Sequence, residues 1–313
     1  MRPRREAPAA VDLATTVGSV VLPNPVLTAS GTSGHGAELG AFFDLSSLGA
    51  VVVKSLAAEP WPGNPAPRVH PVDAGMINSV GLQGPGVEAW LQEDLPGLLT
   101  SGARVVASIW GRTVDAYAKA ASALAGAPPQ VVAVEVNVSC PNVEDRHRMF
   151  AHSESATAAV LEATASCGRP RWAKLSPNVT DLVSVARAAV AGGAEGLTLV
   201  NTVMGMAIDL STRRPALGGG GGGLSGPAVH PVAVRSVYDC RAALPGVPII
   251  GVGGVSRAEH AVELIMAGAC AVQVGTATFA DPRAPARVLS ELTDWCRRHG
   301  VARLADLQGA AHG

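Results

Sequence analysis

The stretch Val131-Val-Ala-Val-Glu-Val-Asn137 is a β-branched run that leads directly into Val138-Ser-Cys-Pro-Asn142. Short apolar runs of this kind are typical of buried strands. A buried strand that ends in a thiol, Cys140, between two carboxamides, Asn137 and Asn142, suits a site that binds a planar, amide-rich ring and takes a proton from it. A thiol also serves as nucleophile, metal ligand or inert core residue, so the rest of the chain has to decide its role.

Similar runs recur along the chain and alternate with alanine-rich segments of helical periodicity. This alternation is typical of a parallel sheet closed into a (β/α)8 barrel. An open doubly wound sheet is the alternative, but no early Gly-x-Gly-x-x-Gly precedes a helix. We therefore predict an α/β protein with one TIM barrel over 13–310, long active-site loops and a disordered tail over 1–12. The predicted strands are 26–29, 50–54, 104–109, 131–137, 171–175, 196–201, 248–251 and 271–275, and the predicted helices include 113–125, 153–166, 181–191 and 258–267.

Composition excludes several classes of function. The net charge of −1 over 313 residues gives no electrostatic basis for binding nucleic acid or an acidic membrane. No helical apolar run of 18 residues and no signal-peptide core is apparent, so we expect a soluble, cytoplasmic protein without membrane contact. The five cysteines are far apart and form no C-x-x-C pair. We therefore expect neither a structural zinc site nor an iron–sulfur cluster, and no metal site, in this chain.

Two long inserts interrupt the barrel pattern. Residues 60–85 are rich in proline and glycine, and Gly218 to Gly223 is an unbroken glycine run. A glycine run is most often a flexible linker. It can equally belong to an active-site loop when it follows a strand on the catalytic face, and the sequence does not separate the two interpretations.

The residues at the predicted strand ends form a chemical pattern. In a (β/α)8 barrel the working residues lie at the carboxyl ends of the strands, and each of these residues alone could be a solvated surface group. Two lysines and two asparagines that converge on one rim are harder to dismiss. The polar strand-end residues are Ser30, Lys54, Ser55, Ser108, Asn137, Lys174, Asn201 and Thr202.

The last two strands end in glycine, at Gly253–Gly254 and at Gly275–Thr276. The last two βα loops of such barrels commonly bind phosphate through bare backbone N–H groups. A phosphate here, with lysine and asparagine at the other strand ends, indicates FMN across the barrel mouth. Lys174 would then stabilise the negative charge at the N1/O2 edge of a reduced flavin. No histidine is placed to activate Cys140, so a general base is favoured over a covalent nucleophile.

Taken together, the motifs of the chain resemble the class 1 dihydroorotate dehydrogenases of pyrimidine biosynthesis, from about residue 24 to the C-terminal helix. The motifs are Asn-Pro-Val-Leu-Thr-Ala-Ser-Gly (24–31), Val-Lys-Ser (53–55), Asn-Ser-Val-Gly-Leu (78–82), Asn-Val-Ser-Cys-Pro-Asn (137–142), Lys-Leu-Ser-Pro-Asn (174–178), Asn-Thr (201–202), Leu-Ser-Gly-Pro-Ala (224–228), Gly-Val-Gly-Gly-Val (251–255) and Val-Gly-Thr (274–276).

The resemblance implies a role for each matching residue. Cys140 matches the base that removes the C5 proton of dihydroorotate while a hydride leaves C6 for flavin N5. The implied substrate contacts are Lys54, Asn78, Gly81, Leu82, Asn137, Asn142, Asn201 and Thr202. The implied FMN contacts are Ser30, Lys54, Ser55, Ser108, Asn137, Lys174, Val200, Gly226, Gly253, Gly254, Gly275 and Thr276.

The resemblance also implies partners. Cysteine rather than serine at position 140 is typical of class 1, and Asn-Thr-Val-Met-Gly-Met-Ala-Ile-Asp (201–209) resembles the class 1B catalytic subunit. That subunit works with a second chain that carries FAD and a 2Fe–2S cluster and passes electrons to NAD. A homodimeric core is the expected assembly.

Two residues depart from the family pattern. Gly84 stands where asparagine is common, and Ser108 stands where an asparagine usually meets the flavin. They leave room for a paralogue with another substrate or electron acceptor. The alternatives are a dihydropyrimidine dehydrogenase-type flavin barrel, a non-redox phosphate-binding barrel such as an aldolase, and a degenerate barrel that acts as a scaffold.

Overall fold

The computed structural model describes residues 11–140 and 149–313. Eight parallel strands form its central sheet in the order β3-β16-β15-β10-β9-β8-β7-β4. The sheet closes on itself, because Gly49 N–H donates to the Val26 carbonyl at 2.9 Å and Leu27 bridges to Ala50. The predicted (β/α)8 barrel is confirmed. Its strands are β3 (Val26–Thr28), β4 (Val51–Val52), β7 (Val105–Ile109), β8 (Val131–Asn137), β9 (Arg171–Leu175), β10 (Gly196–Leu199), β15 (Ile249–Val252) and β16 (Ala271–Val274).

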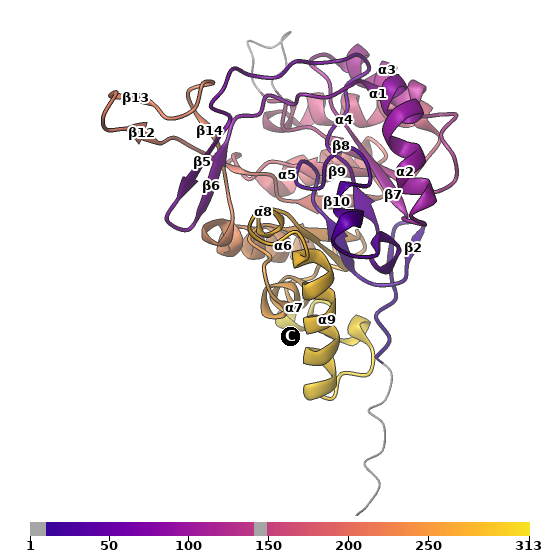
Figure 1. Cartoon of the computed structure of the whole chain (residues 1–313). Helices are drawn as coiled ribbons and strands as arrows, with labels where there is room; N and C mark the ends of the chain where they lie inside the picture. The colour runs from indigo at the N-terminus through magenta and orange to yellow at the C-terminus, as the bar shows by residue number, and fades with distance from the viewer. Residues whose placement is uncertain (1–10, 141–148) are drawn as a thin grey trace, which may run out of the picture.

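Helices surround this barrel (Figure 1). Several helices begin after residue types that commonly cap helix N-termini. The side chains of Thr113, Ser153 and Asp181 each accept a hydrogen bond from a backbone N–H of the first turn. Each helix therefore starts one residue later than the predicted segment. The helices are α1 (Val87–Ala89), α2 (Leu95–Thr100), α3 (Val114–Ala123), α4 (Glu154–Ala163), α5 (Leu182–Ala191), α6 (His230–Ala243), α7 (Ala258–Met266), α8 (Ala277–Ala280) and α9 (Ala284–Arg298).

Several barrel strands are shorter than predicted at their carboxyl ends. The ladder of β4 ends at Val52 and that of β10 at Leu199. Beyond these points some backbone bonds still reach a neighbouring strand, since Asn201 N–H donates to the Leu175 carbonyl of β9 at 2.8 Å, whereas Lys54 N–H donates to the Gly34 carbonyl in a loop at 2.9 Å. The rim residues therefore project partly from strands, such as Asn137 on β8 and Lys174 on β9, and partly from the loops that follow them. At the opposite end, the hairpin of β1 (Thr15–Val17) and β2 (Val20–Leu22) packs Val17 and Leu22 against the barrel interior.

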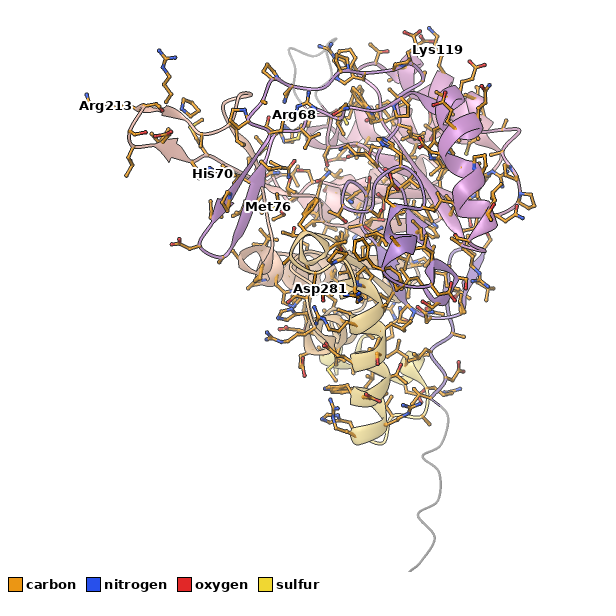
Figure 2. The ribbon with its side chains drawn as sticks, in the orientation of Figure 1. Arg68, His70, Met76, Lys119, Arg213 and Asp281 are labelled. Atoms are coloured by element: carbon orange, nitrogen blue, oxygen red, sulfur yellow. The ribbon has the colours of Figure 1, made fainter. Side chains whose placement is uncertain are left out.

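The two long inserts pair with each other across the barrel mouth. They form a four-stranded sheet in the order β11-β14-β6-β5, which lies to one side of the barrel (Figure 1). Its strands are β5 (Val69–Val72), β6 (Gly75–Asn78), β11 (Val203–Gly205) and β14 (Gly222–Ser225). A further two-stranded hairpin, β12 (Ile208–Asp209) and β13 (Arg214–Pro215), projects beyond it, with Arg213 at its tip (Figure 2).

The glycine run is part of this sheet. Gly222 and Gly223 lie in β14 and pair with β6 and β11. A Cβ on Gly222 would stand 2.5 Å from the Asn78 carbonyl oxygen, and a Cβ on Gly223 would overlap the Thr202 side chain. Gly222 and Gly223 are therefore packed, and close approach requires glycine at these two positions. The flexible-linker interpretation is wrong for Gly222 and Gly223, which are paired in a sheet, and the active-site-loop interpretation stays a prediction.

The folded part begins earlier than the predicted boundary at residue 13. Asp12, which falls in the predicted tail, donates its N–H to Ala302 at 2.8 Å and so belongs to the folded part. Residues 1–10 lie outside the described residues. Within 11–140 and 149–313, no helix has the length and apolar character needed to cross a membrane.

Candidate active site

A cavity of about 530 Å³ opens at the carboxyl ends of the barrel strands, between the barrel loops and the four-stranded sheet. Nearly all the predicted site residues meet here, although they come from segments spread over more than 240 positions of the chain. Those that line the cavity are Ser30, Lys54, Ser55, Asn78, Gly81, Leu82, Asn137, Lys174, Val200, Asn201, Thr202, Gly226, Gly253, Gly254, Gly275 and Thr276.

Two predicted residues, Ser108 and Cys140, lie outside the lining, and a third, Asn142, is not among the described residues. Ser108 is fully buried and lies behind Ser55. The Ser55 Oγ is 2.9 Å from the Ser108 Oγ and 3.2 Å from the Ser30 Oγ. Ser108 therefore supports a chain of hydroxyls and does not itself line the cavity. Cys140 is also fully buried and outside the lining. Asn142 lies outside the described residues.

The amide side chains are held by one another. The Asn137 Oδ1 accepts a hydrogen bond from Asn201 Nδ2 at 3.2 Å, and the Asn201 Oδ1 accepts one from Thr202 N–H at 2.8 Å. Asn78 Nδ2 donates to the Gly223 carbonyl at 3.3 Å. These bonds fix which way the amides face, so their remaining donors and acceptors are oriented before a ligand arrives.

The cavity is positively charged. Lys54, Lys174 and Arg112 line it, and no aspartate or glutamate does so among the described residues. Burial lowers the pKa of Lys54, and the nearby Arg68 lowers it further. Sequence reasoning missed Arg112, which lies 5.2 Å from the centre of the Trp61 ring. An arginine three residues beyond a strand end carries no signal of this contact, because Trp61 belongs to a distant insert.

One end of the cavity is built from glycine backbone. Gly226, Gly253 and Gly254 have φ values of 103°, 144° and 69°, in the region that disfavours other residues. A Cβ on Gly254 would stand 2.8 Å from the His230 Cβ, and one on Gly253 would stand 2.7 Å from the Ala233 Cβ. This end is a surface of bare backbone in which Gly253 and Gly254 follow β15 and Gly226 follows β14, and such glycine loops commonly bind phosphate in these barrels.

The Cys140 thiol lies beside buried polar groups. It is 3.4 Å from the Asn137 carbonyl oxygen, which also accepts a hydrogen bond from the Tyr117 hydroxyl at 2.6 Å. Burial raises the pKa of Cys140 to about 12, although the Tyr117 hydroxyl and Lys54 act to lower it. The pKa of Tyr117 is itself raised well above its usual range by burial. Tyr117 lies inside α3, and nothing in the sequence indicated that it reaches the thiol.

The two departures from the family pattern do not alter the cavity lining. Gly84 lies outside the lining and pairs its backbone with Trp61, with the N–H donating at 3.0 Å. A Cβ at this position would meet His35 Nε2 at 3.2 Å. Ser108, as described above, is buried behind Ser55. Neither Gly84 nor Ser108 therefore contributes to the described lining.

Comparison with known proteins agrees with this geometry. A sequence profile of the family described as dihydroorotate dehydrogenase matches residues 12–295. A protein of Desulforudis audaxviator named dihydroorotate dehydrogenase B (NAD(+)), catalytic subunit, is 48% identical over 303 residues, 96% of this chain and 98% of its own. The protein of the same name from Alkaliphilus metalliredigens is 44% identical over 96% of this chain and 99% of its own. A Solibacter usitatus protein named putative dihydroorotate dehydrogenase A (fumarate) is 46% identical over 95% and 97%. The chain belongs to the dihydroorotate dehydrogenase family, and its similarity extends over the length of class 1B catalytic subunits.

Proposed function

We propose that this chain oxidises dihydroorotate to orotate in pyrimidine biosynthesis, with FMN as its bound cofactor and Cys140 as the general base. The observation that carries the proposal is the single cavity that collects the two lysines, the oriented amides and the glycine backbone at one end of the barrel. The cavity is lined by positively charged side chains and by no acidic residue among the described lining, so it suits a ligand with a carboxylate and a cofactor with a phosphate.

The lining fits FMN. The glycine backbone at Gly253 and Gly254 has no room for a Cβ and leaves N–H groups for a phosphate. Lys174 lines the cavity, and its Nζ lies 3.5 Å from Glu135 Oε1 but donates no hydrogen bond among the described residues, so its N–H donors can serve a ligand. We expect the cofactor to be held by Ser30, Ser55, Lys174, Val200, Gly226, Gly253, Gly254, Gly275 and Thr276. FMN supplies the acceptor for the hydride that leaves C6.

The protein's own residues bind and deprotonate the substrate. The Lys54 ammonium pairs with the carboxylate of dihydroorotate, and Asn78, Asn137 and Asn201 read the N–H and C=O edges of the ring. Asn142, outside the described residues, is proposed for the same role. The Cys140 thiolate takes the proton from C5. A thiolate whose conjugate acid has a raised pKa is rare at neutral pH but is a stronger base once formed.

We further propose that the chain works in the cytoplasm as a homodimeric core with a separate electron-transfer subunit that carries FAD and a 2Fe–2S cluster. Relatives that carry the words catalytic subunit and NAD(+) in their names support the second subunit. Exposed apolar residues on the projecting hairpin, Ile208 and Leu210, support association. Light scattering of the purified chain tests the dimer.

The cofactor and the electron acceptor are tested together. The cofactor released from purified protein by acid should have the mass of FMN, and orotate should form from dihydroorotate when an acceptor is supplied. NAD with the partner subunit, fumarate and a quinone are compared as acceptors, with NAD expected to need the partner. Protein that holds no flavin, even after incubation with FMN, would overturn the proposal and favour a non-redox barrel.

A further inference from the structure

The interior of this barrel carries a polar cluster directly below the cavity. Barrel interiors are usually filled by branched apolar residues. Here Glu135 on β8, Lys174 on β9 and Gln273 on β16 point inward, and they are 0%, 6% and 0% exposed. All three side chains are therefore shielded from solvent, so contact with water does not explain why polar residues occupy these positions.

The contacts within the cluster tie it together. Glu135 Oε2 accepts a hydrogen bond from Gln273 Nε2 at 2.7 Å, and Glu135 Oε1 lies 3.5 Å from Lys174 Nζ. Glu135 Oε1 accepts no hydrogen bond among the described residues. A fully buried carboxylate is costly unless it is paired, and Lys174 is the cation that faces it.

Lys174 connects this cluster to the cavity. It is the one member of the three that lines the cavity, so its ammonium is held from below by Glu135 and is open to a ligand from above. A lysine side chain has four rotatable bonds and would otherwise choose among many positions. The amide of Gln273 in turn fixes the carboxylate, because it occupies the oxygen that does not face Lys174.

We infer that Glu135, oriented by Gln273, is a positioning residue that holds Lys174 Nζ at the floor of the cavity, against the edge of the flavin that becomes negative on reduction. This inference rests on the proposed function, because it takes FMN to be the ligand above Lys174. Glu135 itself touches neither substrate nor cofactor. Its effect on the flavin passes through the place that it gives to Lys174.

Two roles of Glu135 predict opposite signs for the redox potential. If Glu135 positions Lys174, then Glu135→Gln releases the ammonium and the reduced flavin loses stabilisation. If Glu135 acted only as a nearby negative charge, its removal would favour the reduced flavin. The side chain of glutamine keeps the shape of glutamate and can still accept the hydrogen bond from Gln273, so the substitution isolates the charge contact.

The experiment measures the midpoint potential and the retention of FMN in the full chain. For Glu135→Gln we expect the ratio of reduced to oxidised flavin at a fixed potential to fall at least tenfold, a shift of about 30 mV for a two-electron couple. In a Lys174→Gln background the same change should shift the ratio less than threefold. Thr198→Val is the matched control: it removes a buried hydroxyl beside Lys174 that has no partner among the described residues, and it should leave the potential unchanged.

Each outcome either supports or overturns the positioning role of Glu135. A rise in potential, an unchanged potential, or an equal shift in both Lys174 backgrounds would overturn the positioning role while the proposed function stands. Wild-type protein that holds no FMN would instead overturn the proposed function and this inference with it. If Glu135→Gln does not fold, Gln273→Met removes the hydrogen bond to Glu135 without changing any charge, and it should lower the ratio in the same direction.

Discussion

The buried thiol of Cys140 should make dihydroorotate oxidation depend steeply on alkaline pH. Burial raises its pKa to about 12. At pH 8 such a thiol is about 0.01% thiolate, whereas an ordinary thiol with a pKa of about 8.5 is roughly one quarter thiolate. If Cys140 is the base, as proposed, only its thiolate can accept the C5 proton, so the rate of flavin reduction should rise about tenfold per pH unit between about pH 7 and 10.

The assay is anaerobic stopped-flow reduction of the bound flavin by saturating dihydroorotate, with FMN retention checked at each pH. Cys140→Ser should lower the rate by orders of magnitude while FMN stays bound, because a hydroxyl is far less acidic than a thiol. Cys270→Ser is the matched control: Cys270 is also buried with a raised pKa, but it lies away from the cavity and should leave the profile unchanged. A rate that levels off below about pH 9, or an unchanged rate in Cys140→Ser, would refute the reasoning.

Three further substitutions follow from the geometry of the cavity. Gly254→Ala puts a Cβ 2.8 Å from the His230 Cβ at a φ of 69°. FMN affinity, measured by fluorescence titration, should fall at least tenfold, and the free energy of unfolding, measured by thermal melting, should fall by about 1–3 kcal/mol. Unchanged affinity would exclude this loop as the phosphate site. Gly223→Ala puts a Cβ onto the Thr202 side chain, so the KM for dihydroorotate should rise while FMN stays bound; a normal KM would remove Thr202 from the substrate contacts. Tyr117→Phe removes a hydroxyl that lowers the pKa of the Cys140 thiol, so flavin reduction at pH 8 should slow, and a faster rate would contradict that effect.

The barrel strands could be predicted from sequence because each is a buried run with a clear polar or glycine end. The predicted bounds 131–137 and 171–175 agree with β8 and β9. Strand ends mark the rim in any such barrel, which is why Lys54, Asn201 and Gly254 were found on one cavity without knowledge of their contacts.

The mouth of the barrel could not be predicted in the same way. The sheet of β5, β6, β11 and β14 forms by pairing segments about 145 residues apart, such as Asn78 with Gly223. Neither insert has strong strand periodicity, so the pairing is set by tertiary packing. The burial of Cys140 and its contact with Tyr117 also depend on how α3 packs against β8, and the local sequence does not predict this packing.

The most direct test of the proposed function is a single turnover without an electron acceptor. Purified protein, mixed anaerobically with excess dihydroorotate, should bleach its bound flavin and form one orotate for each flavin reduced. Flavin that stays oxidised in the presence of dihydroorotate, or flavin that is reduced without formation of orotate, would contradict the proposed function.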